Sequence, residues 1–470
     1  MSAVESGLLL SPRAVGLSFF RSFSFWRNLI VAFLVISPLL IRFWCLSKVP
    51  PAPIPFDVEE FDRIEIEPGQ NAFDDFREAT RLKAAVAADY KASGKVFEWN
   101  DVNAVMANGW SVATDPLKQW LLDNREAMQV WRRGTECSDA LFMSPSEMSL
   151  SEILPVAQDL RSFARMAQID AVRLESEDRL LEAAELYLAI LRSSDLVRRH
   201  GSIIQNLIGV SINSMATGPL LKLSEDSRLT AEDLRSALKQ VKAVNQNFEP
   251  PSTAWKLEYL SAIHSLSQTG WCKETGLTEK YEKFEPYAST GMEAFLWIMG
   301  EPEVARRTVT HVLTNQLPEI DKPLYERSPM AEPPTVGLFI PHGELSTHSL
   351  SPAAIERAVH RSIVAKHVIV PFAQYDKNMS RDRASRVGLE LVLAAQIYFR
   401  EHGEFPVETS DLIPDYIDSW PADPLQSTAD GPMQYERESS TSARIFSLGG
   451  WGFDATLQSR TPVPKERAVP

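Results

Sequence analysis

The sequence predicts a mainly α-helical protein with an N-terminal transmembrane helix, a helical-hairpin domain and a small α+β C-terminal element with a short antiparallel sheet. Three observations support this fold class. Residues 29–46 form an apolar run, apolar residues recur at helical spacing from about Gln70 to Asp321, and short extended pieces follow His402. Because the 470 residues are 44% hydrophobic and 23% charged, the chain can bury a large core and global disorder is excluded.

The charge balance excludes one class of partner. The chain has 48 Lys and Arg residues against 62 Asp and Glu residues, a net charge of −14. A protein this acidic has no overall positive field to hold a polyanion, so we expect no nucleic-acid partner. Three cysteines are too few for a disulfide-dense scaffold.

The apolar run is the strongest single feature of the sequence. Residues 29–46 have the length of a short membrane-spanning helix, with Trp26 and Trp44 placed as interfacial anchors at its two ends. Arg42 lies near the distal end, where its side chain can reach the lipid headgroups. A cleaved signal peptide and a buried core helix are the alternatives. No small-residue cleavage site follows the run, which favours a retained anchor.

Basic residues on one side of this helix predict its orientation. Arg13, Arg21 and Arg27 precede the helix, whereas the chain becomes acidic from Asp57 onward. The positive-inside rule then places the N-terminus in the cytoplasm. We therefore expect a single-pass protein of the inner (cytoplasmic) membrane, with the bulk of the chain exported.

The helical region begins after a spacer with four prolines in residues 49–55, a composition that favours extended polyproline structure. Ser149 and Glu152 resemble a capping box at the start of a first amphipathic helix, and residues 175–178 form a polar break before a second. Two such helices should form an antiparallel hairpin. This pair resembles a tetratricopeptide unit in part, and a generic α-hairpin is the alternative; the resemblance lies in Ala171, Leu174, Ala183, Tyr187 and Ile190.

Further helices are expected at 202–223, 230–244, 302–315, from Pro352 onward, and from about Ser380 to Arg400. The predicted organisation is a cytoplasmic tail (1–28), a transmembrane helix (29–46), a Pro-rich spacer (47–56), a helical domain (57–327), a Pro-rich loop (328–352), helices (353–401), an α+β element (402–456) and a disordered tail (457–470).

The C-terminal element resembles the globular part of the major pseudopilins of type II secretion systems. The resemblance rests on a long helix that leads into Gly403-Glu404-Phe405-Pro406, an Asp-Pro turn at Asp423-Pro424, and the segment Phe446-Ser447-Leu448-Gly449. It implies a small antiparallel sheet. Because that family holds calcium in the loop after the last strand, it also implies Asp423 and Asp454 as calcium candidates. A plain turn at Asp423-Pro424 is the alternative.

The chain as a whole is similar to a set of membrane-anchored bacterial proteins with the same order of segments and no assigned activity. The similarity rests on Asn71 to Ala79 and on Trp120 to Ala127, together with the helical hairpin and the pseudopilin-like end. This resemblance implies an architecture but no activity.

No residue pattern in the chain indicates catalysis or a cofactor. His342, Glu344 and His348 lack the helical spacing of a zinc motif, and His360 and His367 are seven residues apart on an expected helix, which is too far for one ion. His402 is expected at a helix C-terminus, where an imidazolium is favourable.

Cys137 and Cys272 are either two buried thiols or one disulfide. Trp99, Trp110, Trp120 and Trp131 are either core anchors or a ligand-stacking surface.

The resulting hypothesis is a binding or assembly protein held at the membrane, with another protein as its partner and with no cofactor. Two alternatives remain. One is an exported hydrolase with a carboxylate or histidine site, which a deep pocket with convergent ionisable side chains would favour. The other is an accessory component of a secretion or pilus-like system.

Overall fold

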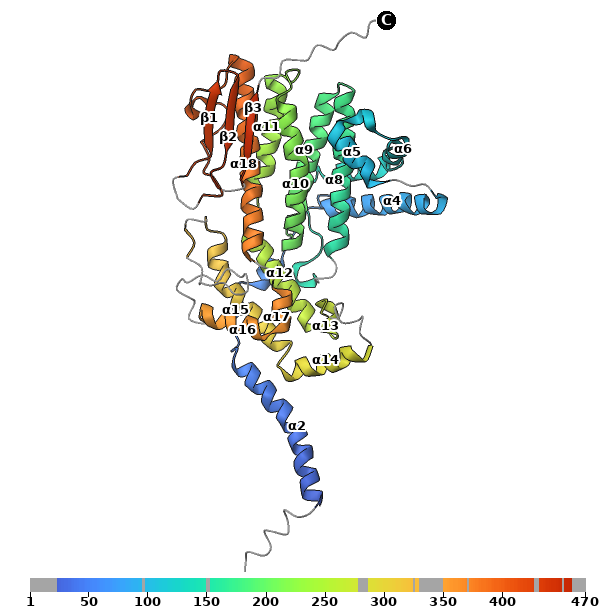
Figure 1. Ribbon diagram of the computed structural model, residues 1–470, viewed down its shortest axis with the longest axis vertical. Coiled ribbons are helices and arrows are strands. Elements are labelled where there is room, and N and C mark those ends of the chain that lie inside the picture. The colour runs from blue at the N-terminus through green and yellow to red at the C-terminus, as the bar shows by residue number, and fades with distance from the viewer. Residues whose placement is uncertain are drawn as a thin grey trace, which may run out of the picture.

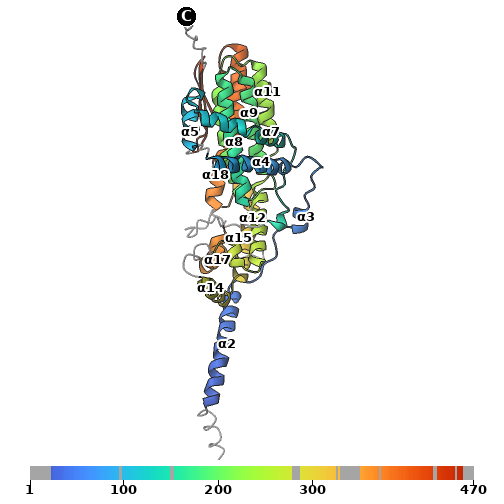
Figure 2. The same cartoon turned by 90° about the vertical axis from the view of Figure 1, so that its right-hand side faces the viewer.

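The computed structural model describes residues 23–94, 98–148, 153–277, 286–323, 326–328, 350–369, 372–426, 431–449 and 452–458. The protein is mainly helical, with one short antiparallel sheet near the C-terminus. Helix α2 projects from one end of the long axis and the sheet lies toward the other end (Figure 1). The view turned by 90° shows the same separation (Figure 2). The predicted fold class is therefore confirmed. Ser149 and Glu152, the expected capping box, lie outside the described residues.

Helix α2 (Phe23–Ser47) contains the expected apolar segment and starts several residues before it. Residues 25–47 are long and apolar enough to cross a membrane, and most of their side chains are exposed. The helix joins the body without a free stalk. Val49 is buried, and the carbonyl oxygen of Pro50 lies 2.9 Å from the Nε2 atom of His311 on α15. The expected spacer at residues 47–56 is non-helical after Ser47, the last residue of α2, and Val49 within it packs against the body.

The segment after this junction forms short helices that cover one side of the body. They are α3 (Val58–Asp62), α4 (Ala72–Ser93), α5 (Trp99–Asn108), α6 (Asp115–Asp123) and α7 (Arg125–Gly134), with single 3-10 turns at Trp110–Val112 and Pro145–Glu147. Helix α4 packs against α7, where Gly134 leaves room for the ring of Phe76. A Cβ atom at Gly134 would lie 2.9 Å from that ring.

The centre of the body is a helical bundle. Helices α8 (Ile153–Ser176) and α9 (Leu180–Leu196) form the expected hairpin, and α10 (Ile203–Ser224) and α11 (Ala231–Gln246) continue the bundle. Helix α18 (Phe372–His402) returns along α10 and α11 (Figure 1). Ser202 and Thr230 each form a capping box that fixes the start of α10 and α11. These helices match the expected ranges within a few residues, except that α18 begins about two turns early.

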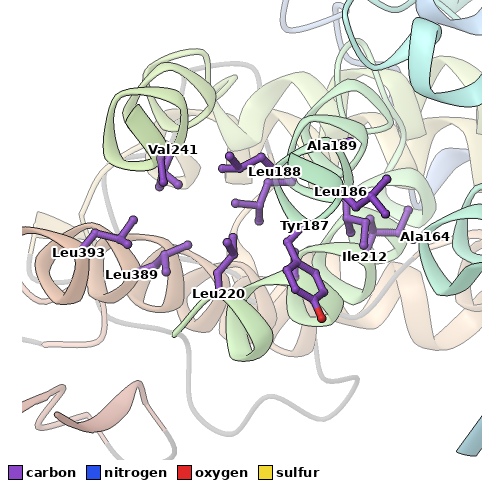
Figure 3. Close-up of a cluster of buried hydrophobic side chains, with 14 of the residues drawn as sticks. Ala164, Leu186, Tyr187, Leu188, Ala189, Ile212, Leu220, Val241, Leu389 and Leu393 are labelled. Carbon is purple, nitrogen blue, oxygen red and sulfur yellow. The ribbon is translucent and has the colours of Figure 1, made fainter. Parts of the chain in front are cut away.

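The main hydrophobic core lies inside this bundle. Side chains from α8, α9, α10, α11 and α18 converge there (Figure 3). The residues of the possible tetratricopeptide resemblance all lie in this core, from Ala171 and Leu174 on α8 to Ala183, Tyr187 and Ile190 on α9. The tetratricopeptide interpretation itself stays a prediction.

A second group of helices lies between the bundle and α2. It comprises α12 (Pro251–Ser267), α13 (Trp271–Glu274), α14 (Pro286–Ile298), α15 (Glu303–Ile320), α16 (Pro352–Arg361) and α17 (Ile363–Val368). Their core includes Trp255, Tyr259, Leu313 and Tyr375, the last of which is on α18. Helix α18 therefore runs through both parts of the body and joins them.

The sheet packs against α18. Strands β1 (Gln434–Ser439), β2 (Ser442–Phe446) and β3 (Asp454–Gln458) are antiparallel in the order β1-β2-β3. The ring of Phe453 fills the space above Gly388, where a Cβ atom would lie 2.3 Å from it. One expected boundary differs here. Strand β3 includes residues 457–458, which were assigned to a disordered tail; the rest of that tail lies outside the described residues.

Candidate functional site

The two calcium candidates are engaged by protein donors. The carboxylate of Asp423 is buried and accepts hydrogen bonds from the Ser447 hydroxyl at 2.7 and 2.8 Å and from the backbone N–H groups of Leu425 and Leu448, both at 3.0 Å. Asp454 lies on β3, where its carboxylate pairs with Arg444 at 2.6 Å. Asp423 thus ties the loop before the sheet to the end of β2, and each carboxylate already has a partner.

The histidines of the sequence analysis do not converge. His342, Glu344 and His348 lie outside the described residues. His360 is on α16 and His367 on α17, so the expectation of one shared helix was wrong; the chain leaves helical geometry at Ser362 between them. His402 is at the C-terminal end of α18 as expected, with its ring stacked on Tyr398 at 4.0 Å.

The four tryptophans have different environments. Trp131 is fully buried and stacks on Phe163, as expected of a core anchor. Trp99 is 46% exposed and contacts Trp120 edge to face. Trp110 lines a cavity of about 460 Å³ between α6 and α8. The core interpretation is thus right for Trp131, and the ligand-stacking alternative stays open at Trp110.

The cysteines are all free thiols, so Cys137 and Cys272 do not form a disulfide. Cys272 is buried as expected, whereas Cys137 is only half-buried.

The residues on which the expected resemblance to membrane-anchored bacterial proteins rests have structural roles, and the resemblance itself stays a prediction. Asn71 caps α4, and its side chain also bonds to both backbone groups of Leu141. In the second motif, Asn124 is buried between α6 and α7, and its amide donates to the carbonyl oxygen of Trp120. These residues position helices and line no site that we describe below.

The most unusual buried feature is a group of charges inside the bundle. Arg198, just after α9, forms a bidentate ion pair with Asp382 on α18, with N–O distances of 2.5 and 3.0 Å. Arg386, one turn further along α18, bonds to the same carboxylate at 3.0 Å. Asn213 on α10 donates to it at 2.8 Å. We call Arg198, Asn213, Asp382 and Arg386 the buried ion network; all four side chains are 5% exposed or less.

Electrostatics keep this network charged. Burial alone would raise the pKa of Asp382, but the charges and hydrogen bonds of Arg198 and Arg386 lower it to about 2. Burial also lowers the pKa of Arg386. One carboxylate thus bonds to two guanidinium groups, and the nearby buried Asp195 also interacts electrostatically with both arginines.

A pocket of about 430 Å³ opens beside this network. It lies between α11, α18 and residues 417–424, and we call it the α11–α18 pocket. Its volume falls within the range of small-ligand sites. Charged and amide side chains line it together with an apolar wall: Lys242, Asn245, Gln246, Arg383, Arg386, Glu390, Asp418 and Ser419, and Phe248, Val387, Leu391, Ile417, Pro421 and Pro424.

Arg383 is the exceptional side chain of the pocket. Its guanidinium lies over the ring of Phe248 at 4.8 Å, and burial lowers its pKa. The nearby Asp376 pairs instead with Arg327 at 2.9 Å. Within the described part of the chain, Arg383 has no hydrogen-bond or ion-pair partner. A half-buried cation without a counterion is costly, so this position is suited to receive an anionic group.

The opposite side of the pocket is acidic. Glu390 accepts a hydrogen bond from the Asn245 amide, and burial raises the pKa of Glu390, with the charge of Asp418 acting in the same direction. Asn245 also accepts from Arg386 at 3.2 Å, which links the pocket to the buried ion network.

A histidine between two carboxylates lies close to this region. The Nδ1 atom of His200 is 3.1 Å from Glu249, and its Nε2 atom is 3.2 Å from Asp139. Both ring nitrogens are thus engaged by carboxylates of the protein. His200 joins three segments and does not have the geometry of a general base.

Sequence reasoning missed the residues of the network and the pocket, although α18 carries a signal for them. Its buried positions follow helical spacing through Tyr375, Met379, Leu389 and Leu393. Asp382 and Arg386 occupy the same stripe. Charged residues four positions apart within an apolar stripe indicate a buried ion pair.

No protein-family model matches the chain, and comparisons with curated proteins and with solved structures find no significant match.

Proposed function

We propose that the protein is a membrane-anchored binding protein, in which α2 crosses the membrane once and the α11–α18 pocket binds a partner. The anchor is supported by the length of α2, its hydropathy and the exposure of its apolar side chains. An apolar helix of a soluble core would instead be buried.

We further propose that the body is exported across the inner membrane of a bacterium. Arg13, Arg21 and Arg27 on the N-terminal side of α2 favour a cytoplasmic N-terminus. Protease added to spheroplasts should digest the body and leave a small fragment containing α2. A body that resists protease until the membrane is lysed would contradict this orientation.

The observation that carries the binding proposal is the guanidinium of Arg383, which has no hydrogen-bond or ion-pair partner among the described residues and lies in a pocket with an apolar wall. A carboxylate would neutralise this charge, and apolar groups beside it would cover Val387, Leu391 and Ile417. The ligand we propose is a segment of another protein that presents an acidic side chain flanked by apolar ones.

A peptide array tests this proposal. Apolar peptides that each carry one Glu would be paired with the same peptides carrying Gln, and incubated with the full-length protein in nanodiscs. We expect the Glu peptides to be retained about tenfold better, equivalent to about 1.4 kcal/mol. Arg383→Gln should remove this preference. Arg132→Gln, the same change at an exposed arginine on α7, should keep it. Equal retention of both peptide sets by the unsubstituted protein would refute the proposal.

A hydrolase is the second candidate, because the same pocket contains Glu390 with a raised pKa and Asp418 close enough to contribute to the shift. Chromogenic ester, glycoside and peptide substrates would test this candidate. Hydrolysis that is lost in Glu390→Gln, with peptide retention unchanged, would favour an enzyme over a binding protein.

A further inference from the structure

Helix α14 presents an apolar face to the outside of the protein. Phe295, Trp297 and Met299, the last just beyond the helix, are 56%, 44% and 38% exposed, whereas Leu296 between them is buried. The one charged residue of α14, Glu293, faces inward, where it hydrogen-bonds with the thiol of the buried Cys272. The outer face thus lacks the charged side chains that normally cover a surface helix.

This helix is fixed to the end of α2. The Arg42 guanidinium donates to the carbonyl oxygen of Trp297 at 2.5 Å and to that of Glu301 at 3.1 Å, and it lies over the Trp297 ring at 4.6 Å. Arg42 therefore caps the C-terminus of α14 rather than simply extending to the headgroups. At Gly300 the two segments are so close that a Cβ atom would lie 3.3 Å from Cys45.

The position of α14 in the body follows from this contact. It lies across the end of the body from which α2 emerges, and both views show it there (Figure 1 and Figure 2). Because Val49 is already buried in the body, no linker separates this end from α2. A membrane crossed by α2 must therefore lie directly against α14.

We propose that α14 lies in the interfacial region of the same bilayer that α2 spans, with Phe295, Trp297 and Met299 in contact with lipid. This inference rests on the proposed membrane anchor. A helix of 13 residues is too short to cross a bilayer, but an apolar helix of this length can lie in the plane of the interface. Tryptophan is the residue most suited to that depth, since its ring is apolar and its N–H is polar.

The Arg42 contact explains how the two elements would share the membrane. A guanidinium near the end of a spanning helix needs polar partners, and the carbonyl oxygens of Trp297 and Glu301 at the C-terminal end of α14 provide them. The helix C-terminus also carries partial negative charge, which favours the cation. Helices α2 and α14 together form an L-shaped anchor, in which α2 spans the membrane and α14 lies at its surface.

Spin labels in liposomes test the proposal. Nitroxides would be attached at Phe295→Cys, at Leu34→Cys in α2 and at Leu122→Cys in α6, in full-length protein whose own three cysteines are replaced by Ala. Leu122 is the matched control, because it is also apolar and exposed, at 52%, and lies on α6, which is far from α2 (Figure 1). The measurement is the accessibility to oxygen, which concentrates in lipid, relative to a water-soluble nickel chelate.

We expect this ratio to be several-fold higher at position 295 than at position 122, and highest at position 34. A low ratio at 295 with a high ratio at 34 would refute the interfacial helix and leave the anchor standing. A low ratio at 34 would refute the anchor itself.

A second measurement avoids the cysteine replacements, which could disturb folding at the buried Cys272. Lipids brominated near the headgroup quench tryptophan fluorescence in the unsubstituted protein, and Trp297→Phe should lower the quenched fraction. Trp131→Phe is the control, because Trp131 is fully buried in the body. An equal quenched fraction in Trp297→Phe and in the unsubstituted protein would contradict the proposal.

Discussion

Arg198 and Asp382 are 184 residues apart in the sequence, yet their side chains form a bidentate ion pair in the centre of the bundle. Asp382→Asn would remove the carboxylate charge to which Arg198 and Arg386 are both hydrogen-bonded. We expect a loss of roughly 3–5 kcal/mol in stability, the usual cost of breaking a buried pair. Circular dichroism during heating in detergent would measure the fall in Tm.

The matched control is Asp454→Asn, which breaks the exposed pair with Arg444. That change should cost about 0–1 kcal/mol of stability.

The pH dependence of stability gives a second check. Because the pKa of Asp382 is lowered to about 2, its contribution is present above the usual value of 3.8 and is lost as the pH falls toward 2. Equal Tm values for the two variants would contradict the role of the network.

Gly209 makes room for the network. A Cβ atom at this position of α10 would lie 2.3 Å from Nε of Arg198. We expect Gly209→Ala to lower the Tm, because the Arg198 side chain must move away from Asp382. Gly218→Ala on the same helix is the control, because a Cβ atom there meets nothing within 4 Å; the gain in helix propensity is opposed by the restriction before Pro219, so the Tm should change little. A Gly209→Ala protein as stable as Gly218→Ala would show that the packing is not tight.

Glu258 should make stability depend on pH. Burial raises its pKa from 4.5 to about 7, and its Oε2 atom has no hydrogen-bond partner among the described residues. Between these two values the unfolded chain ionises while the folded one stays protonated, so stability falls as the pH rises from about 4.5 to about 7. The expected loss is about 3 kcal/mol, and it levels off above pH 7.

Glu258→Gln should flatten this slope, whereas Glu65→Gln, at an exposed position outside any helix, should leave it unchanged. Thermal unfolding at pH 5, 6, 7 and 8 would make the comparison. A slope in Glu258→Gln equal to that of the unsubstituted protein would assign the pH dependence to another group.

Calcium removal should leave the C-terminal sheet intact. The Asp423 carboxylate already accepts from Ser447, Leu425 and Leu448, and Asp454 pairs with Arg444. We expect the same Tm in millimolar calcium and in EDTA. Asp423→Ala should lower the Tm by leaving the donors of its loop without an acceptor, at about 1–3 kcal/mol for a buried group. A rise in Tm with calcium that Asp423→Ala abolishes would restore the calcium site.

Periodicity was sufficient to predict the helices but not the site. The α8–α9 hairpin and the starts of α10 and α11 follow from local signals, namely apolar spacing and the capping residues Ser202 and Thr230. The break at Ser362 between α16 and α17 was missed, because the apolar spacing continues across it. Local patterns fix helices, whereas breaks depend on tertiary contacts such as the bond from Ser362 to the buried Glu301.

The pocket could not be predicted because its parts come from distant segments. Lys242 is on α11 and Phe248 follows that helix, Arg383 is on α18, and Ile417 comes after the 3-10 turn that follows α18. Whether these residues come together in one pocket depends on how α18 packs across the bundle. The sequence shows two charges in an apolar stripe of α18, but it does not show that Arg198 is their partner.

The direct junction between α2 and the body has a mechanical consequence. Val49 and Pro50 hold the chain against α15 immediately after the helix, so the body cannot swivel freely about its anchor. In the membrane-anchored form that we propose, the α11–α18 pocket keeps a constant height above the bilayer and a constant orientation relative to it. A partner embedded in the same membrane would reach the pocket by diffusion within the plane of the bilayer, with the relative orientation already fixed. A flexible segment inserted at Pro50 would let the body rotate and would remove this restriction on orientation.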